Sequence, residues 1–504
     1  MRSRVPGLIF VLVVTGAACS PESSDGTTTT EAPATTATAA TTTTTEAPAT
    51  TTTALEVDRS ELSGIGDVYY PTLGNGGYEV EHYLLDLEYD PATRVLDAEV
   101  TIDTVATANL DTFNLDFRGF EIGSITVDGE EARFDRNGDE LEVWVDSTIG
   151  AGEGFSVAVS YTGEPTSMTS RALFGEQIGW LRSPGQDFVA AEPEGAHSWF
   201  PCNDHPTDRA RYTFRITVPS GTTAAANGIL VDEIDDGETH TWVWELRDEM
   251  VTYLATVVIG EFEIVTDDAS AAIAGVPVRN VLPPDLAAAP NPGLARQGEM
   301  LAWMSELFGP YPFEASGIAA IQGFPGALEN QTLSLFDRGL VEDPFGTNEL
   351  FPIVLVHELA HQWFGNLITL GQWKDIWLNE GFASYTEWLW TEREEGRAAM
   401  EEQIRAERDL WADAAVMAPG EPLPTALFGG EVYRVGAMTL HALRLTVGDD
   451  AFFDILRTYL DRHAGRTAVT EDFIAVAEEV SGRDLTDLFD AWLFQIAVPE
   501  FPDG

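Results

Sequence analysis

The chain has 504 residues, of which 83 are acidic and 27 are basic, so its formal net charge at pH 7 is −56. Such a charge argues against nucleic acid as a partner, and against electrostatic binding to anionic lipid, because like charges repel. Its only cysteines are Cys19 and Cys202, so the fold cannot rest on a disulfide framework.

Residues 1–19 have the pattern of an export signal, with two arginines before an apolar run too short to span a bilayer. The run ends in VTGAACS, which resembles a bacterial lipoprotein cleavage box with Cys19 as the lipidated residue. Gly16 departs from that box, and ordinary signal cleavage near Ala18 is the alternative. We therefore expect an exported protein, either lipid-anchored to the outer face of a bacterial cell membrane or secreted.

Residues 20–60 are dominated by Thr, Ala and Pro and have almost no large apolar side chains. Because such a composition cannot bury a core, we predict that this segment is a disordered linker. About 450 residues remain, which is enough for two or three domains with proper cores.

Residues 61–266 have the period of β-strands. VLDAEVTIDTVA and FSVAVSYTG alternate between apolar and polar residues. ITVDGEEARFDRNGDELEVWV places D-G and N-G turns between such runs, which predicts hairpins. A calcium loop at DRNGDE is the weaker interpretation, because most ligand positions of such a loop are missing. We predict a β-sandwich or saddle domain.

Residues 267–504 change to the helical period. Five segments indicate helices: LARQGEMLAWMSELFG, HELAHQWFGN, IWLNEGFASYTEWLWTEREEG, RVGAMTLHALRLTVG and AFFDILRTYLDRHAG. The predicted fold class is therefore α+β and multidomain, with a mostly helical domain after the β domain.

One of these helices carries the motif H-E-x-x-H. His357 and His361 lie four residues apart, so a helix places both imidazoles on one face. Pro352 suits the first turn of this helix, and Gly365 suits its end. Two such imidazoles are a typical pair of zinc ligands, and Glu358 beside them can act on a water molecule. The alternative is two structural core histidines.

A third ligand is available downstream. Glu380 follows His361 with eighteen residues between them, on a second predicted helix. Three protein ligands with an open fourth position are the pattern of a catalytic zinc. Glu387 lies two turns further along the same helical face, where it can accept the N–H of a ligand histidine. The alternative for Glu387 is a solvated helix charge.

Four motifs in chain order resemble the aminopeptidase N family of zinc metallopeptidases: EPEGAHSWFPCNDHP at residues 192–206, GALEN at residues 326–330, H-E-x-x-H followed by WLNEGFA, and VYRVGA. The resemblance covers about residues 75–500 and implies a thermolysin-like catalytic domain with one Zn²⁺ per chain. The chain ends where many relatives continue into a further helical domain. We therefore expect a short two-domain form, favoured as a monomer, whose cleft is open or closed only by a partner.

The resemblance also implies the catalytic roles. Glu358 takes a proton from water and passes it to the leaving amine, and Tyr433 donates to the developing oxyanion. Two positions depart from the family pattern. Leu328 stands where the signature has Met, and Val435 stands where the family usually has Lys.

The same resemblance implies how substrate binds. Glu329 and Glu192 are expected to hold the free α-ammonium group by charge-assisted hydrogen bonds, with Glu194 as the competing choice for Glu192. Backbone groups of Gly326 and Ala327 are expected to hold the substrate chain as an added strand.

We therefore predict a zinc-dependent aminopeptidase that acts on peptides with a free N-terminus. The alternatives are an endopeptidase or an epoxide hydrolase on the same scaffold, and a non-catalytic surface binding protein. The pair Glu192 and Glu329 argues against a plain endopeptidase. The intact catalytic residues argue against a binding protein.

Overall fold

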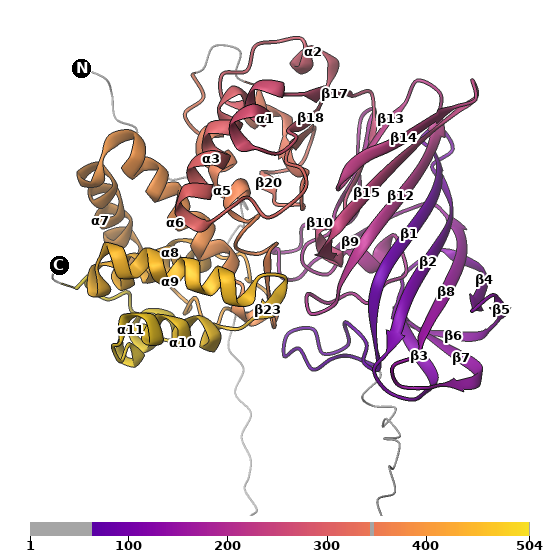
Figure 1. Cartoon of the computed structure of the whole chain (residues 1–504), viewed down its shortest axis with the longest axis horizontal. Coiled ribbons are helices and arrows are strands. Elements are labelled where there is room, and N and C mark those ends of the chain that lie inside the picture. Colours follow the sequence, from indigo (N-terminus) through magenta and orange to yellow (C-terminus); the bar gives the residue numbers. More distant parts are fainter. Residues whose placement is uncertain (1–62, 343–346, 503–504) are drawn as a thin grey trace, which may run out of the picture.

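The computed structural model describes residues 63–342 and 347–502, which form two domains that pack against each other (Figure 1). The predicted fold class is confirmed, because a β-rich domain precedes a mostly helical one. Cys19, the predicted export signal and the predicted linker lie outside the described residues. Within the described ranges, no helix is both long and apolar enough to cross a membrane.

The largest sheet of the N-terminal domain has eight strands in the order β14-β15-β12-β1-β2-β8-β4-β5. These strands are β1 (Tyr78–Asp90), β2 (Val95–Ala106), β4 (Glu121–Val127), β5 (Glu130–Glu131), β8 (Gly154–Gly163), β12 (Arg209–Pro219), β14 (Ile229–Asp235) and β15 (Thr239–Val251). A three-stranded sheet in the order β3-β7-β6 comprises β3 (Leu110–Asp116), β6 (Arg133–Asn137) and β7 (Glu140–Ile149).

The predicted hairpins are present, but they belong to different sheets. β4 and β5 pair around Asp128 and Gly129, whose positive φ angles of 52° and 83° suit a tight hairpin turn. β6 and β7 pair around Gly138, whose φ is 69°. At residue 132 the chain passes from the eight-stranded sheet to the three-stranded sheet. Strand periodicity does not show which strand is the pairing partner, so it could not predict this change.

A third, five-stranded sheet of this domain faces the helical domain. Its order is β13-β16-β11-β10-β9, with β9 (Ser167–Thr169), β10 (Gln177–Ser183), β11 (Gln186–Ala190), β13 (Thr223–Ala226) and β16 (Val257–Gly260). Every residue of β11 is buried, and its Phe188 contacts Phe324 of the second domain, so this strand lies at the interface between the domains.

The second domain begins with a sheet that the helical periodicity did not predict. Its order is β17-β18-β19-β21-β20, with β17 (Glu263–Thr266), β18 (Arg279–Leu282), β19 (Ile318–Ile321), β20 (Ala327–Leu328) and β21 (Ser334–Asp337). β17 lies before the expected boundary at residue 267, yet it pairs with β18. Because β17 is hydrogen-bonded to β18, it belongs to the sheet of the second domain. The second domain therefore starts after β16.

Helices make up most of the second domain. They are α1 (Asp268–Ala274), α2 (Pro284–Ala287), α3 (Gln297–Phe308), α4 (Arg338–Val341), α5 (Phe351–Ala360), α6 (Trp377–Glu395), α7 (Arg397–Ala414), α8 (Gly430–Val447), α9 (Asp449–His463), α10 (Thr470–Ser481) and α11 (Thr486–Leu493). A short parallel pair joins β22 (Ile368–Leu370) and β23 (Arg466–Ala468). α5 ends at Ala360, earlier than the expected stop at Gly365, because the chain turns sharply after His361.

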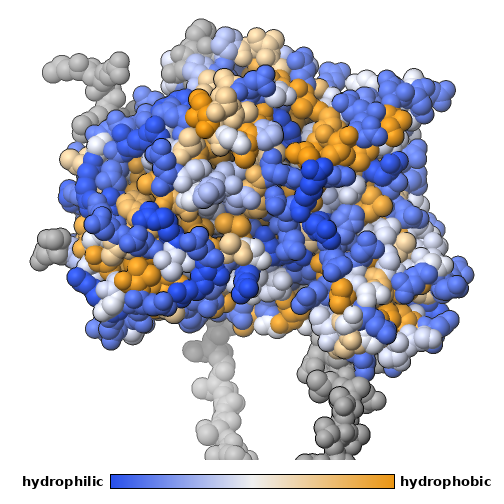
Figure 2. Space-filling model, viewed as in Figure 1, coloured by the Kyte–Doolittle hydropathy of each residue, from blue (hydrophilic) through white to orange (hydrophobic). Residues whose placement is uncertain are grey.

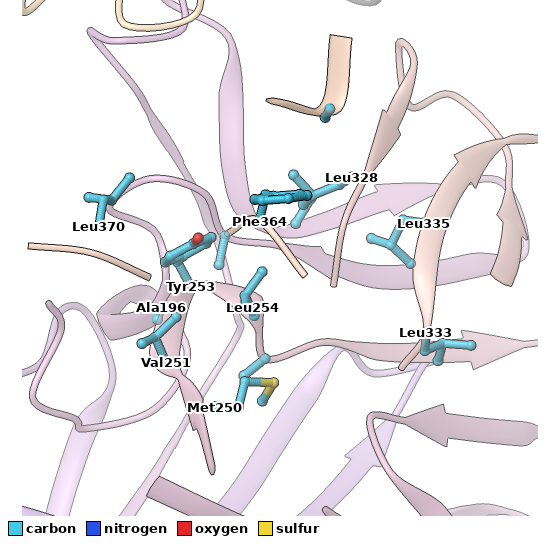
Figure 3. Close-up of a cluster of buried hydrophobic side chains, with 14 of the residues drawn as sticks. Ala196, Met250, Val251, Tyr253, Leu254, Leu328, Leu333, Leu335, Phe364 and Leu370 are labelled. Carbon is cyan, nitrogen blue, oxygen red and sulfur yellow. The ribbon is translucent and has the colours of Figure 1, made fainter. Parts of the chain in front are cut away.

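The two domains share buried apolar contacts. In Figure 3, Val251, Tyr253 and Leu254 of the first domain gather with Leu328 and Phe364 of the second. The outer face shown in Figure 2 is mostly hydrophilic, with hydrophobic residues in separate patches. The apolar side chains that meet between the domains are withdrawn from water, and this burial fixes the relative position of the two domains.

Candidate active site

The motif helix and the next helix bring three side chains together that can bind a metal ion. His357 lies in the last turn of α5, His361 caps its end, and Glu380 lies in the first turn of α6. Nε2 of His357 is 3.2 Å from Oε2 of Glu380, and Nε2 of His361 is 3.5 Å from the same oxygen. All three side chains are buried. Two imidazoles and one carboxylate that converge in this way are the donor set of a catalytic zinc.

The electrostatics of the triad fit a cation at this point. Burial opposes protonation of His357, yet Glu380 and Glu387 raise its pKa to about 10. Burial also raises the pKa of Glu380, but the neighbouring imidazoles lower it to about 2. The nitrogens thus face negative charge that strongly attracts positive charge, which a divalent metal ion supplies while the imidazoles stay neutral.

Each ligand histidine is oriented through its second nitrogen. Nδ1 of His357 lies 2.8 Å from Oε1 of Glu387, the contact expected from the sequence. Nδ1 of His361 lies 3.1 Å from the backbone carbonyl oxygen of Phe364. These acceptors fix the tautomer in which Nε2 is free to bind a metal.

The predicted base and the predicted ammonium ligands lie around one cavity of about 580 Å³. Within the described residues, Glu192 Oε1, Glu329 Oε1 and Glu358 Oε2 are buried oxygens that accept no hydrogen bond. Burial raises the pKa of Glu358 to about 8, against the effect of the nearby imidazoles. Burial likewise raises the pKa values of Glu192 and Glu329. A cationic group in the cavity would satisfy these oxygens.

The structure distinguishes the two competing glutamates. Glu192 lines the cavity, and one of its carboxylate oxygens lies within 4.8 Å of a carboxylate oxygen of Glu329 and of one of Glu380. Glu194 is turned away, because its Oε2 accepts hydrogen bonds from Tyr70 at 3.2 Å and Ser170 at 3.0 Å. Of Glu192 and Glu194, only Glu192 is therefore placed to contact a ligand bound at the triad.

Side-chain amides hold the loop that carries Glu329. Its backbone carbonyl accepts hydrogen bonds from Gln362 at 3.1 Å and Asn366 at 2.8 Å, both just beyond the motif helix. The next residue, Asn330, donates to the carbonyl of Leu254 in the first domain at 3.0 Å. These amides were not identified from the sequence, although two of them belong to the segment HQWFGN.

Tyr433 reaches the triad from α8. Its ring is nearly parallel to that of His357, with centroids 5.9 Å apart, and it lines the cavity. α8 can approach α6 because Gly381 and Gly436 face each other: a Cβ on Gly381 would lie 3.0 Å from the backbone of Gly436. Gly381, directly after Glu380, and Gly436, three residues after Tyr433, thus set the distance between the two helices.

Of the two residues expected to bind the substrate backbone, Ala327 has an open side and Gly326 does not. Ala327 lines the cavity on β20, an edge strand, so its outer side is open to an added strand. Both backbone groups of Gly326 are used within the chain, because its N–H donates to Phe324 and its carbonyl accepts from Asp337. The expected role of Gly326 in strand addition is therefore not supported, since its N–H already has a partner.

The rest of the cavity wall is largely apolar and comes from both domains. The first domain contributes Leu173, Ile178, Trp180 and Phe188, and the second contributes Phe324, Leu328 and Phe428. Phe188 and Phe324 meet edge to face across the domain interface, with ring centroids 6.1 Å apart. The first domain is thus one wall of the site, and Leu328 is part of the opposite wall.

Comparison with known proteins places both domains in described families. Residues 79–254 match the peptidase M1 N-terminal domain, and residues 293–492 match the peptidase family M1 domain. The chain is 30% identical over 329 residues to aminopeptidase M1-A of Oryza sativa subsp. japonica, covering 61% of this chain and 37% of that protein. It is also 30% identical over 329 residues to human glutamyl aminopeptidase, covering 61% and 34%. The chain thus spans little more than a third of the length of these curated relatives.

Solved structures resemble the whole described fold. A mutant of the M1 zinc metallopeptidase from Deinococcus radiodurans, bound to a Tyr-Ser-Ala substrate, superposes with a TM-score of 0.79. That structure is 29% identical, and the match covers 88% of this chain and 100% of that one. A mutant two-domain M1 zinc metallopeptidase bound to L-tryptophan has a TM-score of 0.76 and 30% identity, with the same coverage.

Proposed function

Because this chain belongs to the peptidase M1 family, we propose that it is a zinc-dependent aminopeptidase that removes N-terminal residues from peptides. The observation that carries this proposal is the position of Glu192 and Glu329 beside the metal triad, each with a buried oxygen that lacks a hydrogen bond among the described residues. An α-ammonium group supplies both a positive charge and donors for these oxygens.

Each residue of the site has a proposed role in peptide hydrolysis. Zinc held by His357, His361 and Glu380 would lower the pKa of a water molecule and polarise the scissile carbonyl. Glu358 accepts the proton of the attacking water and delivers it to the leaving amine. Tyr433 donates its phenolic proton in a hydrogen bond to the oxygen that gains charge. Glu358 is buried and Tyr433 is partly buried, which strengthens both interactions.

The proposal includes one zinc ion per chain. The triad is the set of ligands that supports it, since its ligand atoms lie within 4.8 Å of one another. Metal analysis of purified protein should give about one zinc per chain, and strong chelation should remove both metal and activity. Full activity after removal of the metal would contradict this part of the proposal.

The test of the activity is a panel of aminoacyl chromogenic amides, each assayed free and N-acetylated. An aminopeptidase cleaves the free amides and loses most activity on the acetylated ones, because acetylation removes the ammonium charge. Equal rates on both forms would favour the endopeptidase alternative. Turnover of an epoxide substrate instead would favour the epoxide hydrolase, and zinc binding without turnover would favour the binding protein.

We also propose that the protein is exported and anchored by lipid at Cys19, acting as a monomer on external peptides. The cleavage-box resemblance and the Thr-rich linker support this location. Cys19→Ala should release the protein from the cell envelope or block its processing. Wild-type protein found entirely free in the medium would contradict the anchor, and sedimentation of a dimer would contradict the monomer.

A further inference from the structure

Arg434 is a buried arginine next to Tyr433 whose role the sequence motifs leave open. Its side chain is only 9% exposed, and its Nη1 lies 2.8 Å from Oε2 of Glu387. The other oxygen of Glu387 is the one that faces Nδ1 of His357, also at 2.8 Å. A buried arginine is therefore linked to a metal-ligand histidine through a single carboxylate.

This chain of contacts joins four helices. His357 lies on α5, Glu387 on α6 and Arg434 on α8, while Nε of Arg434 lies 3.7 Å from Oε2 of Glu407 on α7. The side chains of His357 and Glu387 are 2% and 3% exposed, so water cannot replace these partners easily. Removing one member leaves its neighbour buried without its partner, which is costly.

We propose that Arg434 is a positioning residue that holds Glu387 in the orientation required to fix His357 as a zinc ligand, an inference that rests on the proposed metal function. With Oε2 bound by Arg434, the Glu387 carboxylate presents Oε1 to the Nδ1–H of His357. That hydrogen bond keeps Nε2 of the ring unprotonated and directed at the metal position.

The role is specific to one of the two ligand histidines. His361 donates to a backbone carbonyl, that of Phe364, whose position depends on the local turn and not on any ion pair. Only His357 depends on the ion pair between Glu387 and Arg434. Val435, the next residue on α8, carries no charge, so Arg434 is the cation of this turn of the helix.

The same contact constrains Tyr433. Arg434 and Tyr433 are consecutive on α8, and the ring of Tyr433 lies nearly parallel to that of His357 at 5.9 Å. An arginine fixed to Glu387 therefore holds this turn of α8 against α6. Loss of Arg434 should affect the zinc ligand and the position of the oxyanion donor together, but not Glu192 or Glu329.

A second arginine on the same helix provides a matched control. Arg444 is also on α8, its side chain is 3% exposed, and it pairs with Glu392 at 2.6 Å and Asp449 at 3.0 Å. Neither carboxylate is part of the zinc triad or its orienting groups. Replacing Arg444 therefore removes a similarly buried arginine of α8, although its partners Glu392 and Asp449 are 22% and 48% exposed, without changing the support of His357.

The experiment measures the zinc dissociation constant of metal-free protein by competition with a chelator of known affinity, for wild type, Arg434→Met and Arg444→Met. Arg434→Met should bind zinc roughly 10- to 100-fold more weakly, because it loses the group that orients a ligand. Arg444→Met should bind zinc as wild type does, although both variants melt at lower temperature. Arg434→Lys, which keeps the charge, should recover most of the zinc affinity.

Two outcomes would overturn the inference. One is zinc affinity in Arg434→Met within about threefold of wild type, well below the loss expected for an orienting group. The other is an equal loss in Arg444→Met, which would show that general destabilisation is the cause. If Arg434→Met does not fold, Arg434→Gln is judged by the same thresholds. Because zinc binding is measured without substrate, a wild-type protein that binds zinc but cleaves no aminoacyl amide would refute the proposed activity and leave this test intact.

Discussion

Replacing Glu329 with glutamine should weaken the preference for substrates with a free N-terminus. The substitution keeps the volume and the backbone contacts to Gln362 and Asn366, which involve the carbonyl and not the side chain. It removes the negative charge of a carboxylate that is 2% exposed and has an oxygen without a hydrogen bond among the described residues. The change therefore tests one interaction with little effect on the fold.

The size of the effect follows from the burial of this carboxylate. A hydrogen bond to a charged group contributes about 1.5–3 kcal/mol, and about 1.4 kcal/mol corresponds to a tenfold change in an equilibrium constant. Glu329→Gln should thus lower kcat/KM on free aminoacyl amides by roughly 10- to 150-fold. Acetylated amides have no ammonium group to lose, so their low rate should change little and the ratio between the two classes should shrink.

The assay is kcat/KM on paired free and N-acetylated amides for wild type, Glu329→Gln, Glu192→Gln and Glu194→Gln. The Glu192 variant should behave like the Glu329 variant, because both carboxylates face the same cavity. Glu194→Gln is the matched control, since Tyr70 and Ser170 hold its carboxylate away from the site. An unchanged ratio in Glu329→Gln, or an equal decrease in Glu194→Gln, would refute the assignment of the ammonium site.

Three further predictions concern catalysis and stability. Glu358→Gln should retain zinc, measured by metal analysis, but lose roughly 100- to 10,000-fold in kcat, because only the proton acceptor is removed. Tyr433→Phe should lower kcat by roughly 100- to 1,000-fold with little change in KM, measured by steady-state kinetics, since it removes one donor to the oxyanion. Burial lowers the pKa of His441 from 6.5 to about 4, so the unfolded chain binds a proton that the folded chain does not bind between these values. Stability should therefore decrease as the pH is lowered through this window, and His441→Gln should remove about 2 kcal/mol of the decrease between pH 7 and pH 4.5, measured by urea unfolding.

The metal motif could be recognised in a short stretch of sequence, whereas the predicted export signal and linker lie outside the described residues and stay predictions. The helix carrying His357 and His361 follows from local spacing, because residues four apart share a helical face. The strand pattern of VLDAEVTIDTVA was equally clear, and β2 alternates between buried and exposed residues as predicted. These features need no knowledge of the rest of the fold.

The sheet of the second domain could not be found in this way. β18 and β19 have four residues each and are buried throughout, so they show no alternation. β17 is similarly short, and its assignment depends on its partner β18. Short buried strands cannot be distinguished by period from other buried segments.

Sequence alone determined which residue types supply the chemistry of this site, because the zinc motif is a matter of spacing along one helix and its neighbour. Only the tertiary structure decided which of two nearby glutamates lines the cavity, since Glu192 faces it while Glu194 accepts a hydrogen bond from Tyr70. It also decided that Arg434, 47 residues beyond Glu387, contacts the carboxylate that faces His357. The physical reason is that a hydrogen bond depends on the distance between two atoms in space, and the packing of helices at Gly381 and Gly436 sets that distance.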